Sequence, residues 1–293
     1  MSIVRAASPT GLALYDQAAA DAAATVIARY STSFGLACRL LGPRPRPHVR
    51  NVYALVRIAD EIVDGPAEEA GLSPEVAGEI LDELENETLS AIDRGFSSNL
   101  VVHAFAGTAR ACGIGEDLVR PFFASMRTDL DTLRHDAASH DAYVYGSAEV
   151  VGLMCLQVFV NAGAPRPLAP SPELVEGARR LGAAFQDVNF LRDLRHDETV
   201  LGRDYLGLST ADGERAAVLD RIDRDLASAA SAIPALPADC RRAVTAAHDL
   251  FAELAVRLRA CDGRQERVRV PDAVKARLAA RALLGFAPRE VRA

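Results

Sequence analysis

Apolar residues return every three or four positions along most of this chain, and no segment alternates between apolar and polar residues. Because an α-helix completes a turn in 3.6 residues, this spacing predicts amphipathic helices. Clusters of Pro and Gly interrupt the pattern, most clearly at 42–47 and 165–172. The predicted helices cover residues 12–29, 33–40, 49–63, 74–93, 98–111, 116–133, 141–162, 173–195, 213–232, 237–261 and 271–285.

The connections between these helices are short, with one longer exception. The segment 196–209 contains Gly202 and Gly207 and is predicted to form an ordered loop or short turn. The sequence shows no internal repeat and no low-complexity linker. We therefore expect a single all-α domain over residues 1–293.

The composition fits this expectation. Hydrophobic residues make up 49% of the chain and charged residues 25%, as in an ordinary soluble globular protein. Alanine is abundant and tryptophan is absent, a composition that favours helices. The formal net charge of −7 argues against nucleic acid as the main partner, because phosphate backbones attract basic surfaces.

Cysteine usage and hydropathy indicate the compartment. The five cysteines are scattered and include no Cys-x-x-Cys pair, which favours a reduced, cytoplasmic setting. The N-terminus lacks the basic-then-apolar order of a secretory signal. No run reaches the ~18 apolar residues of a membrane-spanning helix. The most apolar stretch, 150–160, contains Gln157, and we expect it to form a buried core helix.

Two aspartate pairs with i, i+4 spacing carry the candidate chemistry. The first, Asp60 and Asp64, lies near the end of the predicted helix 49–63, among apolar residues. On a helix this spacing places both carboxylates on one face, where their charges repel unless a cation lies between them. Hard oxygen ligands in this arrangement suit Mg²⁺. Spacing alone is more typical of a solvated helix face, so the apolar neighbours support the metal interpretation.

The second pair, Asp193 and Asp197, belongs to a longer polar stripe. Gln186 and Asn189 precede it at helical spacing, so four polar side chains share one face of the predicted helix 173–195 and its end. Neutral and charged oxygens side by side suit a metal ion and the oxygens of a diphosphate. The sequence therefore predicts a second half for the same site.

An arginine accompanies each pair. Arg57 lies three residues before Asp60, and Arg192 directly precedes Asp193. A guanidinium group can bind phosphate oxygens in a bidentate way. An ion pair within each helix fits the spacing equally well, and the sequence leaves both interpretations open.

These residues resemble the head-to-head prenyl synthases, the family of phytoene and squalene synthases. The matches follow the family's order over roughly residues 30–210, and the wording around 146–154 is similar to that of bacterial phytoene synthases. The matching segments are 31–34 (Ser-x-Ser-Phe), 53–64 (first aspartate motif), 143–152 (Tyr-containing central helix), 186–197 (second aspartate motif) and 202–206 (Arg-x-Tyr-Leu).

Four positions depart from the family's pattern. Glu61 stands where many relatives have a second Asp, and Cys38 occupies a position that is often Ser. Glu149 replaces a common Gly in the central helix, and Gly207 replaces a common Pro. None of these changes removes an expected metal ligand, but Glu149 bears on the shape of the hydrocarbon channel.

The resemblance implies an isoprenoid-synthase-type helical bundle around a central cavity and assigns roles to individual residues. The implied metal ligands are Asp60, Asp64, Asn189, Asp193 and Asp197. The implied substrate-binding residues are Ser31, Ser33, Phe34, Arg57, Tyr143, Gln186, Asn189, Arg192, Arg203 and Tyr205. The implied catalytic residues are Asp60, Asp64, Asp193, Asp197, Tyr53 and Arg57. The rings of Phe34, Tyr53 and Tyr143 are expected to stabilise cationic carbon.

The resemblance also implies a reaction. Two molecules of geranylgeranyl diphosphate would join head to head through a cyclopropylcarbinyl (prephytoene) diphosphate to give phytoene and pyrophosphate. Mg²⁺, with Mn²⁺ as an alternative ion, would neutralise the leaving pyrophosphate. NADPH is not expected, because a phytoene-type reaction ends in the loss of a proton.

Three other hypotheses remain on the sequence. A squalene-type or presqualene diphosphate synthase would use farnesyl diphosphate, and the squalene-type enzyme would need NADPH. A class I terpene cyclase fits less well, because the second motif lacks the Asn/Asp–Ser/Thr–Glu spacing of that family. A non-catalytic helical assembly or binding relative would be expected to have lost the aspartate pairs, and both are present.

The expected partners follow from the same resemblance. Allylic prenyl diphosphates are the expected ligands, and nucleic acid is not expected. A long hydrocarbon product favours transient contact with a membrane surface. We therefore expect a cytoplasmic protein that can be peripheral to the inner face of the membrane; the sequence leaves its oligomeric state open.

Overall fold

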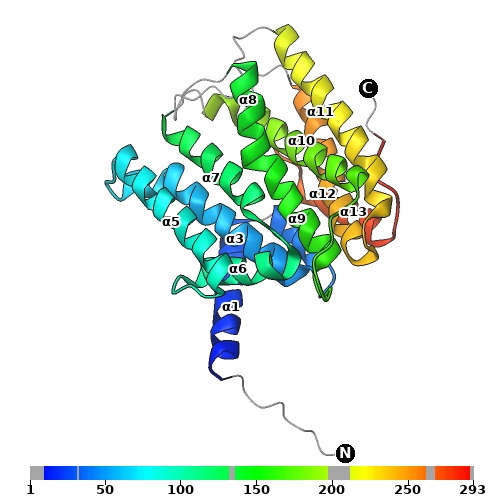
Figure 1. Ribbon diagram of the computed structural model, residues 1–293. Helices are drawn as coiled ribbons and strands as arrows, with labels where there is room; N and C mark the ends of the chain where they lie inside the picture. The colour runs from blue at the N-terminus through cyan, green and yellow to red at the C-terminus, as the bar shows by residue number, and fades with distance from the viewer. Residues whose placement is uncertain (1–9, 32, 132–135, 197–211, 262–267, 291–293) are drawn as a thin grey trace, which may run out of the picture.

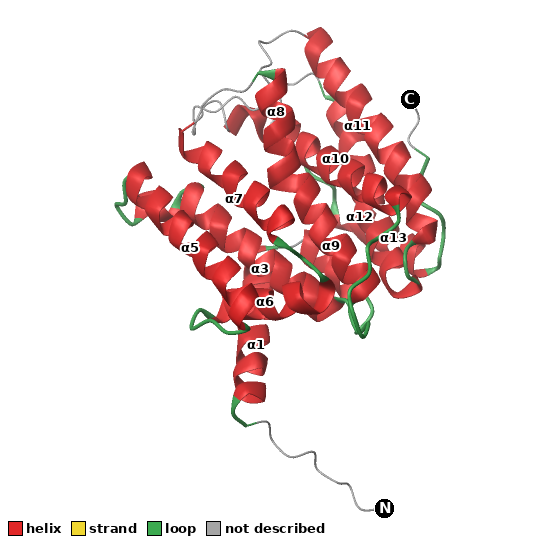
Figure 2. Cartoon of the chain, in the orientation of Figure 1, coloured by secondary structure: helices red, strands yellow, loops and turns green. Residues whose placement is uncertain are grey.

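The structure is a computed structural model that describes residues 10–31, 33–131, 136–196, 212–261 and 268–290. Throughout these ranges the chain forms helices and connecting loops and no strand (Figure 1, Figure 2). The elements are α1 (Leu12–Tyr30), α2 (Ser33–Leu40), α3 (Arg46–Val63), α4 (Pro66–Glu69), α5 (Pro74–Arg94), α6 (Leu100–Cys112), α7 (Glu116–Asp131), α8 (Ala137–Val144), the π-helical turn η1 (Tyr145–Glu149), α9 (Val150–Asn161), α10 (Pro172–His196), α11 (Asp212–Ala232), the 3₁₀ turn η3 (Ile233–Ala235), α12 (Ala238–Ala260) and α13 (Asp272–Leu283).

The predicted all-α fold is confirmed, and the predicted helices match the observed ones within a few residues. The short elements α4 and η3 were not predicted. The central helix begins at Ala137 and not at 141, because α8, η1 and α9 follow one another without a break. Most of the predicted loop 196–209, and the end of the predicted helix 116–133, lie outside the described residues.

Local sequence signals explain where several helices begin and end. The Oδ1 atom of Asn99 accepts hydrogen bonds from the backbone N–H groups of Val101 and Val102 and so caps α6. Gly95 and Gly113 follow α5 and α6 with φ of 79° and 75°, a left-handed conformation that glycine adopts without steric cost. These caps fix the lengths of two helices that pack against α3.

Two large hydrophobic clusters and two smaller ones form the interior of the described bundle. The largest one joins α1, α2, α3, α5, α6, α7, α9 and the start of α12, and the second joins α10, α11 and α12. The η1–α9 segment packs against α10 through glycines. A Cβ atom on Gly152 would lie 2.7 Å from the carbonyl oxygen of Ala178, and one on Gly182 would lie 2.6 Å from that of Ala148. The absence of side chains at these two positions lets the helices approach closely.

The segment Ser139–Asn161 is long and apolar enough to cross a membrane by length and composition, with a mean hydropathy of 1.5. This corrects the expectation that no run would reach that limit. The helix packs against α7 and α10 inside the bundle, and 44% of its most apolar window is buried. The expectation that 150–160 forms a core helix is therefore confirmed.

Arg44, in the α2–α3 connection, ties three parts of the bundle together. Its guanidinium group donates to both carboxylate oxygens of Asp239 at 2.9 and 2.8 Å. It also donates to the carbonyl oxygens of Phe159 and Ala162, each at 2.8 Å. These bonds satisfy carbonyls at the end of α9 and hold the start of α12 beside it.

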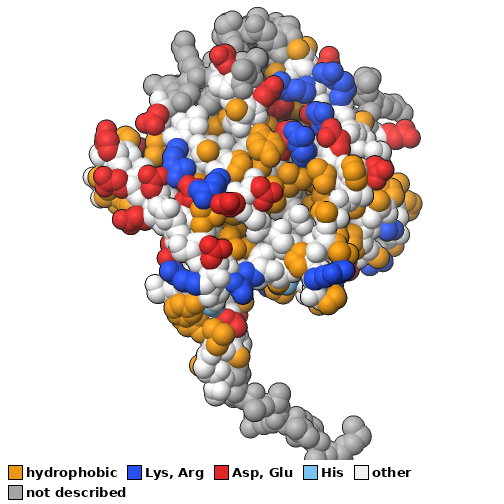
Figure 3. All heavy atoms as spheres, in the orientation of Figure 1, with side chains coloured by type: hydrophobic (Ala, Val, Ile, Leu, Met, Phe, Trp, Pro, Cys, Tyr) orange, Lys and Arg blue, Asp and Glu red, His pale blue; other side chains and the backbone are white. Residues whose placement is uncertain are grey.

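The surface carries charge of both signs. On the face shown in Figure 3, acidic and basic side chains are interspersed, and hydrophobic side chains gather near the middle. The first turns of α1 project from the bundle, where Leu12 and Leu14 are exposed (Figure 1). No single-sign patch covers this face, in line with the composition.

Candidate functional site: an apolar cavity with an acidic mouth

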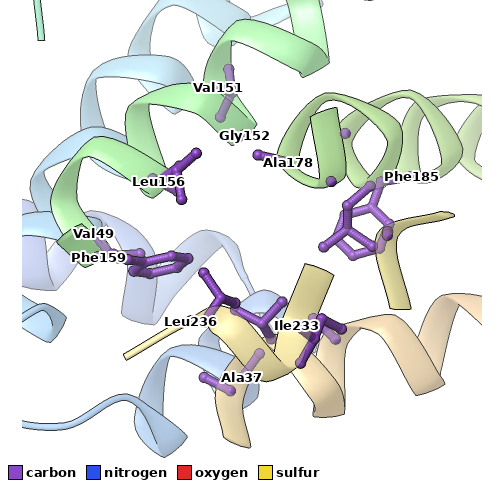
Figure 4. Close-up of a pocket in the computed structure, with 18 of the residues that line it drawn as sticks. Ala37, Val49, Val151, Gly152, Leu156, Phe159, Ala178, Phe185, Ile233 and Leu236 are labelled. Atoms are coloured by element: carbon purple, nitrogen blue, oxygen red, sulfur yellow. The ribbon is translucent and has the colours of Figure 1, made fainter. Parts of the chain in front are cut away.

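A cavity of about 250 Å³ lies between α2, α3, α9, α10, η3 and α12 (Figure 4). This is many times the ~10–15 Å³ that holds one water molecule. Its wall is almost wholly apolar. The side chains labelled in Figure 4 converge on it from opposite sides, Val151, Leu156 and Phe159 from α9 and Phe185 from α10. Ser147 and Gln186 are the polar residues among those that line it.

On α3, one helix face leads from the cavity to the first aspartate motif. Val49 lines the cavity. Tyr53, Arg57 and Asp60 follow it at steps of four, four and three residues, so they continue the same face toward the end of the helix. Asp64 is the residue that ends α3, with φ −116° and ψ 38°, and it is exposed. The expectation of two stacked helical carboxylates is therefore met by Asp60 but modified at Asp64, which has left the helix.

On α10, the second motif continues the cavity wall in the same way. Gly182 and Gln186 line the cavity. Asn189 and Asp193 follow Gln186 on the same face toward the end of the helix. Both helices thus change from an apolar cavity wall to polar and acidic residues as they approach their C-terminal ends.

The aromatic residues predicted for the site lie at the edge of the cavity. Phe34 lines the cavity, and its ring stacks on that of Tyr53 with centroids 5.4 Å apart. Burial raises the pKa of Tyr53, and a hydrogen bond with Ser31 opposes that shift. Ser31 also accepts a hydrogen bond from the backbone N–H of Gly35 at 3.1 Å. The structure therefore brings Ser31, Phe34 and Tyr53 together, as expected.

Arg57 forms ion pairs within its own helix. It contacts the carboxylate of Glu61, and its Nη1 lies 3.9 Å from Asp60 Oδ2. Its guanidinium carbon also lies 4.7 Å from the centroid of the Tyr30 ring. Glu61, which stands where many relatives have Asp, thus supplies the carboxylate that holds Arg57 beside the first motif.

Asp60 experiences a cluster of like charges. Burial, followed by the charge of Asp64, raises the pKa of its carboxyl group to about 8; Asp129 and Glu61 add to this shift, and Arg57 opposes it. About 30% of its side chain remains accessible, so the carboxyl group lies in a recess and not in a closed core. A divalent cation in this recess would relieve the repulsion.

Asp129 on α7 is a site residue that the sequence analysis missed. Its side chain is buried, and it accepts a hydrogen bond from the hydroxyl group of Tyr143 at 2.8 Å. Tyr143 was predicted for the site, and through Asp129 it is connected with Asp60 of the first motif. The sequence does contain a signal: Asp129 follows Phe122 and Met126 at helical spacing and occupies a position of the buried face of α7.

The described part of the second motif also contains an ion pair. Arg192 and Asp193 lie 2.6 Å apart, and their side chains are 22% and 20% accessible. The alternative of an ion pair within the helix, which the sequence left open, is observed for both motif arginines. Asp197, Arg203 and Tyr205 lie outside the described residues, and the side chain of Ser33 is likewise not described.

Glu149 was expected to affect the shape of the hydrocarbon channel, but in the structure it holds two helices together. Glu149 does not line the cavity and pairs with Arg179 of α10 at 2.6 Å. The Arg179 guanidinium lies over the ring of Tyr145 at 5.6 Å. Glu149 therefore stabilises the crossing of η1 and α10 and leaves the cavity wall to Ser147, Ala148 and Val151.

The donors present fit a hard divalent ion. No group of three His, Cys, Asp or Glu side chains within the described ranges is already gathered in metal-binding geometry. The first motif nevertheless offers the oxygens of Asp60 and Asp64, and burial together with the charge of Asp64 raises the pKa of Asp60 although Arg57 lies nearby. Asn189 and Asp193 offer a second set of oxygens on α10. Carboxylate and amide oxygens of this kind suit Mg²⁺ or Mn²⁺.

Comparison with known proteins identifies the family. The model of the squalene/phytoene synthase family matches residues 27–273 of this chain. The chain therefore belongs to the squalene/phytoene synthase family, a family of prenyl-transferring enzymes. The resemblance read from the sequence motifs is confirmed.

The relatives found by sequence include phytoene synthases from plants and bacteria. Phytoene synthase of Pseudescherichia vulneris is 27% identical, and the match covers 83% of each chain. Phytoene synthase 3 of Zea mays is 31% identical over 64% of this chain, and 15-cis-phytoene synthase of Synechocystis is 33% identical over 62%. The match spans 44% of the maize protein and 54% of the cyanobacterial one.

Solved structures share the fold. A dehydrosqualene synthase superposes with a TM-score of 0.73, with coverage of 92% of this chain and 97% of that one, at 22% identity. A squalene synthase from Alicyclobacillus acidocaldarius gives the same TM-score at 18% identity and covers 86% of this chain and 97% of its own. The isoprenoid-synthase-type helical bundle predicted from the resemblance is thereby confirmed.

Proposed function

We propose that this protein is a Mg²⁺-dependent phytoene synthase, which condenses two molecules of geranylgeranyl diphosphate head to head and releases pyrophosphate. The observation that carries the proposal is the continuity of the site. On both α3 and α10, a single helix face runs from the wall of the apolar cavity to the acidic motif. A molecule with an apolar tail and a diphosphate head matches this arrangement.

We assign metal binding to one group of polar residues and phosphate binding to another. Asp60, Asp64, Asn189, Asp193 and Asp197 would hold the metal ions, which supply positive charge to the departing pyrophosphate. Arg57, Arg192, Arg203, Ser33 and Tyr205 would bind the remaining phosphate oxygens. Arg57 and Arg192 can do so by exchanging their present carboxylate partners for phosphate, since metal ions would then neutralise those carboxylates.

The cavity would protect the carbocation that forms when the carbon–oxygen bond breaks. Its wall offers almost no polar group to a water molecule, and water would quench the cation. The stacked rings of Phe34 and Tyr53 lie where the cavity meets the first motif and would stabilise positive charge through their faces. Tyr143 is not among the residues that line the cavity, and its hydroxyl donates a hydrogen bond to Asp129 close to the first motif.

The relatives support the choice of reaction. Those named above from maize, Synechocystis and Pseudescherichia are phytoene synthases, and the last of them matches over most of both chains. The product would be a long hydrocarbon, so we also propose a cytoplasmic protein that touches the membrane surface transiently.

The test is incubation of the purified protein with geranylgeranyl diphosphate, Mg²⁺ and detergent, without NADPH. We expect a C40 hydrocarbon and pyrophosphate, and no product in the presence of a chelator. Farnesyl diphosphate with and without NADPH, assayed alongside, distinguishes a squalene-type enzyme. The absence of C40 product, or full turnover by Asp193→Asn, would overturn the proposal.

A further inference from the structure

A buried acidic residue lies inside the second motif but takes no part in its polar stripe. Asp187 is 2% exposed. Its Oδ2 accepts a hydrogen bond from Arg221 Nε on α11 at 2.8 Å, and its Oδ1 lies 3.2 Å from His140 Nε2 on α8. Arg221 Nη2 lies 3.1 Å from the same nitrogen of His140. Three helices therefore meet at one buried group of side chains.

Asp187 points to a different side of α10 from the stripe. At about 100° per residue, it lies about 100° from Gln186, about 160° from Asn189 and about 120° from Asp193 around the helix. A contact on that side cannot touch a ligand of the stripe directly, but it determines which way the stripe faces. The bonds to α8 and α11 hold α10 against rotation about its own axis.

The same group is connected with the first motif. His140 lies one helical turn before Tyr143 on α8, so both side chains share a face. The ring of Phe190 on α10 contacts both, at centroid distances of 5.8 Å to His140 and 5.9 Å to Tyr143. Tyr143 in turn donates its hydroxyl to Asp129, whose charge acts on Asp60. Ring contacts, one hydrogen bond and the charge of Asp129 thus link α10 to the recess of the first motif.

We propose that Asp187 is a positioning residue, which with His140 and Arg221 sets the orientation of the second metal-binding stripe toward the first. This inference rests on the proposed function, because it assigns Asp187 to the geometry of that site. The proposal does not require Asp187 to touch the substrate or a metal ion. Its effect reaches the site through the rotation of α10 and through the contact of α8 with that helix.

The chain offers a matched control on the same pair of helices. Arg180 of α10 forms an ion pair with Asp225 of α11 at 3.3 Å, and Asp225 is 6% exposed. That pair also joins α10 to α11 and, within the described residues, forms no hydrogen bond with α8 or with the polar stripe, although the charges of Asp187 and Arg221 act on Asp225 through space. Removal of either ion pair should therefore lower stability, whereas only the substitution of Asp187 should also disturb the geometry of the site.

The experiment compares Asp187→Asn with Arg180→Gln in the full-length protein. The first readout is the rise in melting temperature produced by Mg²⁺ together with geranylgeranyl thiodiphosphate, which does not depend on turnover. The second is the Mg²⁺ concentration that gives half-maximal condensation. Because loss of a residue that orients metal ligands typically costs about 10–100-fold in metal affinity or activity, we expect a shift of that size for Asp187→Asn and less than about 2-fold for Arg180→Gln.

Asp187→Glu, which keeps the charge, should bind Mg²⁺ better than Asp187→Asn. Arg221→Gln should weaken Mg²⁺ binding as Asp187→Asn does. If Asp187→Asn does not fold, His140→Asn and Arg221→Gln carry the test. Mg²⁺ dependence equal to that of the control would overturn the inference. A wild-type protein that makes no condensation product, but whose ligand-induced melting shift is lost in Asp187→Asn, would refute the proposed function and retain the positioning role.

Discussion

The raised pKa of Asp60 leads to a prediction that can be tested without substrate. Its carboxyl pKa is raised from the ordinary value of 3.8 to about 8, by burial first and by Asp64 second. The native state therefore binds this proton more tightly than the unfolded state. Between about pH 4 and pH 8 this carboxyl group is ionised in the unfolded state but still protonated in the native state, so the stability of the native protein falls as the pH rises. Above about pH 8 the group is ionised in both states and the loss is complete. Asp60→Asn removes the charge and should abolish this loss.

The size of the effect follows from linkage. When the native state binds one proton more than the unfolded state, the free energy of unfolding falls by about 1.4 kcal/mol per pH unit. Between pH 6 and pH 8 the variant therefore gains at most about 2.7 kcal/mol relative to wild type. Because 30% of the Asp60 side chain is accessible, solvent screening reduces this to roughly 1–2 kcal/mol. In a chain of this size that corresponds to about 2–6 °C in melting temperature.

The assay is thermal unfolding of wild type, Asp60→Asn and the exposed-site control Asp21→Asn at pH 6, 7, 8 and 9, first with a chelator and then with Mg²⁺. We expect the advantage of Asp60→Asn to grow up to about pH 8 and then to level off. Mg²⁺ should raise the melting temperature of wild type at pH 8 more than that of the variant, which keeps the ligands of the second motif. A pH-independent difference, or a variant less stable than wild type at pH 8, would refute the reasoning.

Three further variants test other parts of the structure. Tyr143→Phe removes the hydroxyl that donates to Asp129, and we expect turnover to fall about 10-fold or more with a melting temperature within about 4 °C of wild type, measured by steady-state kinetics and calorimetry. Arg44→Ala removes the hydrogen bonds to Asp239 and two carbonyls and should lower the free energy of unfolding by about 2–3 kcal/mol in denaturant titration, whereas an effect below about 0.5 kcal/mol would contradict the role of Arg44. Gly182→Ala places a Cβ 2.6 Å from a backbone oxygen of the neighbouring helix and should cost about 1–3 kcal/mol; unchanged stability would show that the helices separate freely.

Much of the fold was predictable because helical spacing and Pro/Gly breaks are local signals. The breaks at 42–47 and 165–172 cover most of two observed connections and run into the first residues of α3 and α10, and the apolar stretch 150–160 lies inside the central helix. The short helix α4 was missed because its four residues carry no periodicity. The merging of α8, η1 and α9 was missed for another reason: the π-helical turn at Tyr145–Glu149 depends on close packing, where Gly146 approaches Ser125 of α7.

The site was predictable where its residues lie along one helix. The stripe of Gln186, Asn189 and Asp193 can be read from spacing alone, and the structure places it on the cavity-facing side of α10. Contacts between helices could not be read in this way. Asp129 reaches the site because α7 packs beside α3, and the partners of Asp187 come from α8 and α11. Such contacts depend on which helices become neighbours, and a single sequence does not encode that in its periodicity.

The position of the acidic motifs along their helices adds a physical argument for the metal. Asp60 lies in the last turn of α3, Asp64 ends that helix, and Asp193 lies in the last turn of α10. The C-terminal end of a helix carries about half a negative charge, so carboxylates there are disfavoured by roughly 0.3–1 kcal/mol each, and cations are favoured. Like-charge repulsion at Asp60 adds to this cost. Carboxylates at the C-terminal ends of both helices are therefore unfavourable for stability alone, and bound divalent cations would make the arrangement favourable.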